Sequence, residues 1–171
     1  MNTLNVFPVV CIMLCSNLQA ASLPMFSGFT LGITREEVQN KADSLAVLYG
    51  SETVKDSNTI IIHADKNSFP DLFSVVSIKC MFNKKKTIQA LIITCKAENV
   101  FQVETIVNEI EKLIGAADNK GSVIGFSTEL EWNKGKNYKC YLFSSEKDRE
   151  CYFLFATHSF MKEEMGRSGN Q

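Results

Sequence analysis

The chain has 171 residues, six cysteines and a formal net charge of −1 at neutral pH. This length suffices for one compact domain or for two small domains that share a core. A charge so close to zero argues against a nucleic-acid-binding protein, because such proteins carry an excess of lysine and arginine. The only basic run, Lys84-Lys-Lys86, is placed where a hairpin turn is expected and indicates a solvated turn.

Residues 1–21 have the composition of a secretory signal peptide. The first charged side chain is Arg35, Val6 to Leu14 is apolar, and small residues near Ala20 offer a cleavage site. The apolar run is too short for a transmembrane helix. We therefore expect a secreted or periplasmic protein with no integral membrane segment after cleavage. Lipidation at Cys15 stays an open alternative.

A first repeat is expected over residues 22–97, beginning with a helix. Thr34 is the predicted N-cap, Glu37 completes a capping box, and Gly50 ends the helix. The apolar stripe between them consists of Val38, Ala42, Leu45, Leu48 and Tyr49. A strand over residues 59–64 and a hairpin of strands 73–82 and 87–96 follow, so this unit is a helix plus three strands.

The same order recurs over residues 98–160. Asn99 caps a second predicted helix with Gln102 at the box position, and Gly115 ends it. A strand over residues 125–132 and a last hairpin, 137–155, follow. The recurrence predicts an α+β fold of two tandem helix-plus-three-strand repeats, with helices packed on antiparallel sheet and one continuous sheet as an open variant. Residues 161–171 are polar and are expected to form a flexible tail.

The last hairpin has aromatic strands on either side of a polar block, Ser144 to Arg149. A turn centred between residues 145 and 146 places Cys140 opposite Cys151, with both facing a core. This opposition predicts a disulfide between them. The other face then carries Lys139 opposite Tyr152, and Tyr141 opposite Glu150.

Cleavage of the signal peptide would leave four cysteines, an even number that favours disulfides in an exported chain. In the first hairpin, a turn centred between Lys85 and Lys86 places Cys80 opposite Leu91 and Cys95 opposite Val76. The two cysteines are then about 13 Å apart along the strands. A Cys80–Cys95 disulfide therefore needs a different turn or a bulge, and buried thiols are the alternative.

No combination of residues predicts catalysis, a cofactor or a metal site. The two histidines, His63 and His158, each stand alone on a strand-like segment. Cys-x-x-Cys zinc knuckles, a Gly-rich phosphate loop and a Gly-x-Ser-x-Gly elbow are all absent from the sequence. We therefore expect a protein that is not an enzyme, and a hydrolase is the third-ranked hypothesis.

Four aromatic residues gather in the second unit: Trp132, Tyr138, Tyr141 and Tyr152. They either cover the sheet as core residues or form an aromatic patch that binds a partner. The first functional hypothesis is an exported module that binds another protein, as an inhibitor, immunity factor or envelope adaptor. The alternative is a carrier of a small apolar ligand. The identity of the partner and the oligomeric state stay open.

Gly32-Ile-Thr-Arg-Glu-Glu-Val38 resembles the Gly-Met-Thr-x-x-x-Val helix opening of small envelope proteins in the BamE (SmpA/OmlA) group. The tandem helix-plus-sheet order is similar to that of the β-lactamase inhibitory protein group. The resemblance implies a small exported α+β protein. A tandem cystatin-like arrangement is the alternative, but the Gln-x-Val-x-Gly loop by which cystatins block proteases is absent. Neither resemblance carries a functional residue over to this chain.

Overall fold

The structure is a computed structural model that describes residues 25–26, 28–49, 52–63, 75–121, 129–134, 137–145, 147 and 149–168. Within these residues there are three helices, α1 (Arg35–Tyr49), α2 (Val100–Ile114) and α3 (His158–Ser168). The described strands are β1 (Glu52–Lys55), β2 (Thr59–His63), β3 (Val75–Phe82), β4 (Ile88–Lys96), β5 (Asn119–Lys120), β6 (Glu129–Lys134), β7 (Tyr138–Ser145) and β8 (Glu150–Thr157).

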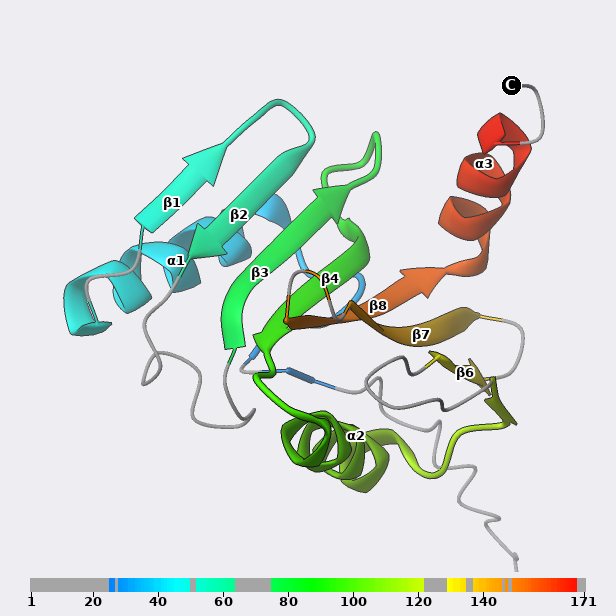
Figure 1. Cartoon of the computed structure of the whole chain (residues 1–171). Helices are drawn as coiled ribbons and strands as arrows, with labels where there is room; N and C mark the ends of the chain where they lie inside the picture. Colours follow the sequence, from blue (N-terminus) through cyan, green and yellow to red (C-terminus); the bar gives the residue numbers. More distant parts are fainter. Residues whose placement is uncertain are drawn as a thin grey trace, which may run out of the picture.

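These strands form one antiparallel sheet in the order β1-β2-β3-β4-β8-β7-β6-β5 (Figure 1). The centre of the sheet is the pair β4 and β8, which runs from Ala90 opposite Ala156 to Lys96 opposite Glu150. The short strands β1 and β5 lie at the two edges. Strands from the two halves of the chain are therefore joined directly at the middle of the sheet.

The predicted fold of two helix-plus-three-strand repeats is wrong. The structure is mostly a single eight-stranded sheet, and α1 and α2 are each followed by four strands. The sequence did not reveal β1 and β5 because their residues are mainly polar and exposed, without the apolar alternation that marks a strand. Backbone hydrogen bonds to the neighbouring strand are sufficient to add such edge strands.

Helices α1 and α2 cover one face of the sheet, which we call the inner face. Val38 and Ala42 of α1 are buried there, as are Val103, Ile106 and Ile110 of α2. The strands contribute alternate side chains to the same cluster: Ile60, Ile62, Ile78, Cys80, Leu91, Ile93, Cys95, Leu130, Trp132, Cys140, Leu142, Cys151, Phe153 and Phe155. Because this cluster is continuous from β2 to β6, the two halves share one hydrophobic core.

Helix α3 packs on the opposite face, which we call the outer face (Figure 1). Phe160 is buried against Ala90 and Ala156, whose side chains alternate with those of Leu91 and Phe155 on the inner face. The structure therefore places residues 161–168 in a helix, where the sequence predicted a flexible tail beginning at residue 161. Residues 169–171 and the predicted signal peptide, 1–21, lie outside the described residues.

The predicted helix starts are confirmed. Thr34 Oγ1 accepts a hydrogen bond from Glu37 N at 3.3 Å, and Glu37 Oε2 accepts one from Thr34 N at 2.7 Å, which completes the capping box. The Asn99 side chain accepts from Gln102 N at 3.1 Å. At the end of α2, Gly115 adopts a φ of 85°, a conformation that favours glycine. Gly50 lies outside the described residues.

The register of the first hairpin was predicted closely. Cys80 lies opposite Leu91 as expected, whereas Cys95 lies opposite Val75 and not Val76, because the register shifts between Val75 and Ser77. Such a shift adds one residue to one strand and moves all later pairs.

The register predicted for the last hairpin is wrong. Cys140 lies opposite Phe155, and Cys151 lies opposite Ser144. The polar block was expected to form the turn, but Ser144 and Ser145 extend β7, so that the turn comes two residues later. Because the pairing moves by an even number of residues, every side chain stays on the face that was predicted.

Candidate functional site

The four aromatic residues predicted to bind a partner lie on opposite faces of the sheet. Trp132 is fully buried on the inner face, and Tyr138 packs on the edge of the same core with its ring 4.9 Å from that of Phe155. Burial raises the pKa of the Tyr138 hydroxyl, and the neighbouring Cys140 adds to this effect. Tyr141 and Tyr152 lie on the outer face and are half-buried.

Trp132 has a structural role. Its indole Nε1 donates a hydrogen bond to the carbonyl oxygen of Gly115 at 2.8 Å, so it satisfies a carbonyl at the end of α2. Its ring meets that of Phe153 edge-on at 6.0 Å. Trp132 therefore fixes α2 to the inner face and has no surface left for a partner.

On the outer face, β7 and β8 carry a group of apolar side chains that we call the outer-face patch: Tyr141, Phe143, Tyr152 and Leu154. Tyr141 lies opposite Leu154, and Phe143 lies opposite Tyr152. The rings of Phe143 and Tyr152 are stacked, with centroids 5.0 Å apart and planes at 21°. Phe143 is nevertheless 46% exposed, an unusual degree of exposure for a residue this large in the inner strands of a sheet.

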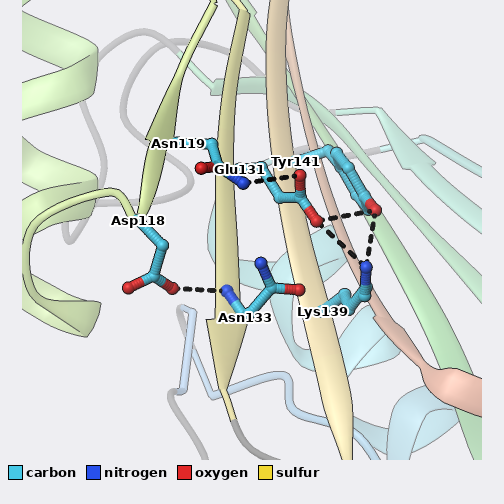
Figure 2. Close-up of polar contacts among 6 residues, drawn as sticks. All are labelled: Asp118, Asn119, Glu131, Asn133, Lys139 and Tyr141. Carbon is cyan, nitrogen blue, oxygen red and sulfur yellow. Dashed lines mark hydrogen bonds and ion pairs between the residues drawn. The ribbon is translucent and has the colours of Figure 1, made fainter.

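A polar cluster borders the outer-face patch on the side of β6 (Figure 2). Lys139 Nζ is 3.0 Å from Glu131 Oε1, and the Tyr141 hydroxyl donates to the same oxygen at 3.2 Å. Asn119 Nδ2 donates to the other oxygen, Oε2, at 3.3 Å. Figure 2 shows that these side chains, from β5, β6 and β7, converge on the Glu131 carboxylate.

The electrostatics of this cluster agree with its geometry. The hydrogen bond from Lys139 lowers the pKa of Glu131, with smaller contributions from Asn119 and Tyr141. The hydrogen bond to Glu131 in turn raises the pKa of Lys139. Both groups are therefore charged at neutral pH, and they orient the ring of Tyr141 beside the patch.

The sequence indicated part of this site. Tyr141 and Tyr152 were predicted residues, and both belong to the outer-face patch. Phe143 was missed, although it follows Tyr141 by two residues and alternation alone places it on the same face. Glu131 was also missed, because no local pattern shows which side chains on neighbouring strands it will meet.

A polar groove of about 650 Å³ lies on the outer face between α3 and the β3–β4 turn. Its lining includes Lys84, Lys85, Gln89, Phe160 and Glu163. These groups are mainly polar and charged, and they give no specific support to a carrier of an apolar ligand. That alternative stays a prediction.

The predicted Cys140–Cys151 pairing does not occur, because the two residues are separated by four positions along the strands. The structure contains no disulfide among the cysteines it describes, all of which are buried. Cys80 and Cys95 are likewise four positions apart on their hairpin, as the sequence predicted.

We found no group of three or more His, Cys, Asp or Glu side chains placed to hold a metal ion among the described residues. His63 ends β2 and is exposed, whereas His158 begins α3 directly after β8, which lies three strands from β2 in the sheet. They are thus not brought together. That the protein is not an enzyme stays a prediction.

The described residues therefore form an eight-stranded antiparallel sheet with three helices, and an aromatic patch lies on its outer face. Comparisons of the chain with models of protein families, with curated proteins and with solved structures gave no match. The resemblance to the BamE group thus stays a prediction. None of the helices in the described part of the chain is long and apolar enough to cross a membrane.

Proposed function

We propose that this protein is exported and binds another protein, without catalysing a reaction, through the outer-face patch. One observation carries the proposal: Phe143, stacked on Tyr152, is 46% exposed on a sheet face that α1 and α2 do not cover. Export is supported by the composition of residues 1–21.

The chemistry of the patch suits protein recognition. Aromatic side chains are enriched among the residues that dominate binding energy, because they bury a large area at a small cost in side-chain entropy. Strands β7 and β8 hold these rings on a rigid support, and Glu131 holds the hydroxyl of Tyr141. Because these side chains are already held in place, binding orders them less and loses less side-chain entropy, which favours affinity.

The surroundings of the patch suggest what its partner presents. Glu129 is exposed and lies opposite Phe143, and Glu150, two residues before Tyr152 in the chain, accepts a hydrogen bond from the Tyr152 hydroxyl at 2.5 Å. We expect the partner to offer an apolar surface for the rings and a lysine or arginine for Glu129. The charge pair at the rim would set orientation and association rate more than affinity.

The proposal is tested by comparing the proteins captured by three forms of the chain. Immobilised wild-type protein, a Phe143→Ala/Tyr152→Ala variant and a Val47→Ala variant are exposed to the envelope and extracellular fractions of the source cell. Val47 is 86% exposed on α1 and is the matched control. We expect a protein that is captured by the wild type and the control and is lost with the patch variant. The affinity of that protein, measured by calorimetry, should fall at least tenfold.

Equal affinity for the wild type and the patch variant would overturn the proposed surface. Native mass spectrometry of the purified protein separates the proposal from the carrier alternative. We expect the mass of the chain alone. A retained small molecule, removed by solvent extraction, would favour the carrier instead.

A further inference from the structure

Cys95 and Cys151 face each other across the centre of the sheet. They are direct partners in the register of β4 and β8. Both side chains point to the inner face, and each residue is only 1% exposed. The sequence did not predict this pair, because the two residues belong to different hairpins and are 56 positions apart in the numbering.

The backbone hydrogen bonds define the spacing of this pair. Ala97 N donates to Arg149 O at 2.9 Å, so residues 97 and 149 are a hydrogen-bonded pair. Such pairs recur every second residue in an antiparallel ladder, so Cys95 and Cys151 are also one. The Cα atoms of such a pair are about 5.5 Å apart, within the range of about 4.4–6.8 Å found for disulfides. Its Cβ atoms, also about 5.5 Å apart, have to approach by about 1 Å to reach the Cβ spacing of a disulfide.

No other pairing among the four described cysteines is compatible with the register. Cys80 and Cys140 lie in one row across the sheet, but Leu91 and Phe155 stand between them. Three strand spacings separate them by about 14 Å. Every remaining combination is displaced by four residues along the strands, which is about 13 Å or more.

We propose that Cys95 and Cys151 form a disulfide under oxidising conditions and so link the two central strands of the sheet. The oxidant is a small or protein disulfide, such as oxidised glutathione. One thiolate attacks it, forming a mixed disulfide and releasing one thiol. The second cysteine, as thiolate, then displaces the second thiol, so that two cysteine thiols are oxidised and one disulfide is reduced to two thiols.

Burial determines when this bond forms. It raises the pKa of the Cys95 thiol to about 12, with a further contribution from nearby Cys151, whose own pKa burial raises to about 11. Little thiolate is therefore present in the folded protein, and the core excludes the oxidant. The disulfide is expected to form during folding, before the core closes, and only slowly in the folded, reduced protein.

The experiment is to fold the reduced, denatured protein in a glutathione redox buffer, unfold it in denaturant that contains an alkylating agent so that the remaining buried thiols are blocked, and map the peptides without reduction. We expect a peptide pair linked through Cys95 and Cys151, with Cys80 and Cys140 alkylated. The midpoint of urea unfolding should then fall when a reductant is added. The same oxidant added to the folded, reduced protein should produce the linked pair much more slowly.

Two variants complete the test. Cys95→Ala should remove the linked peptide pair and make the unfolding midpoint independent of reductant. Cys80→Ala should retain the linked peptide pair and the dependence of the midpoint on reductant. Complete alkylation of Cys95 and Cys151 in the wild type that was folded with glutathione and then alkylated in denaturant, or a predominant link to Cys80 or Cys140, would overturn the proposal. If a variant does not fold, the peptide map of the wild type still decides whether Cys95 and Cys151 are linked.

Discussion

Glu131 illustrates how one residue connects the edge of the sheet to the candidate site. Its carboxylate accepts hydrogen bonds from Lys139, Tyr141 and Asn119, and these residues come from β7 and β5 on either side of β6 (Figure 2). The cluster therefore holds the short edge strand β5 in place and orients a ring of the outer-face patch. Its stability depends on the charges of Glu131 and Lys139.

We expect Glu131→Gln to lower the free energy of unfolding at pH 7 by at most about 1 kcal/mol, as for other ion pairs close to the surface. The folded-state pKa of Glu131 is below its unfolded value, so its contribution is present above the unfolded pKa and is lost as pH falls through the folded pKa. The folded-state pKa of Lys139 is above its unfolded value, so the ion pair is lost at high pH only when the pH rises through the folded-state pKa of Lys139.

The difference in the free energy of unfolding between the wild type and Glu131→Gln should thus be largest near neutral pH and should vanish in strong acid. Urea unfolding at pH 7 and at about pH 3 measures it. Glu129→Gln on the same strand is the control, because the described residues supply it with no ion pair. A difference of the same size at both pH values would show that charge is not the cause.

At the scale of elements, the turns of the two central hairpins contain non-glycine residues in a left-handed conformation. Lys86, with a φ of 58°, ends the β3–β4 turn, and Arg149, with a φ of 53°, ends the β7–β8 turn. In the first turn, the Asn83 side chain accepts hydrogen bonds from the backbone N–H groups of Lys85 and Thr87 at 2.9 and 3.2 Å. These hydrogen bonds hold the turn closed, but the backbone of Lys86 is strained.

Lys86→Gly should raise the free energy of unfolding by about 0.5–1 kcal/mol, because relief of the left-handed strain exceeds the greater chain entropy of glycine in the unfolded state. Lys85→Gly is the matched control. Lys85 has no positive φ, so the same change there should lower stability by about 0.5 kcal/mol. Thermal unfolding of both variants measures the effect. A loss of stability in Lys86→Gly would contradict this account.

At the scale of the whole molecule, one core spans both halves. Phe153, at the centre of β8, lies opposite Leu142 of β7 and Ile93 of β4. Its ring is also 5.1 Å from that of Phe26 and 6.0 Å from that of Trp132. Residues from the beginning, middle and end of the described chain thus meet at one side chain, and we expect the halves to unfold together.

Phe153→Ala should lower the free energy of unfolding by about 3–5 kcal/mol, the usual cost of removing a buried aromatic ring. Urea unfolding followed by the fluorescence of Trp132, the only tryptophan, and by far-UV circular dichroism should give coincident transitions in the wild type. Phe143→Ala, on the exposed side of the sheet, is the control and should cost much less. Two separate transitions in the wild type would show that the core is divided.

Much of the local structure could be predicted from the sequence, because it depends on residues close together in the chain. The capping boxes placed the starts of α1 and α2, and alternation placed Tyr141 and Tyr152 on the outer face. The role of Trp132 could not be resolved in this way. Its burial depends on the carbonyl of Gly115, which is 17 positions away and is brought near by the packing of α2.

The sequence by itself therefore determined where α1 and α2 begin and which face of the two predicted hairpins is apolar, since both follow from interactions within a few residues. Only the tertiary structure decided that β4 meets β8, that β1 and β5 complete the edges, and that Cys95 faces Cys151. Distant strands pair according to the core they bury together and the length of the turns between them. No local pattern contains that information.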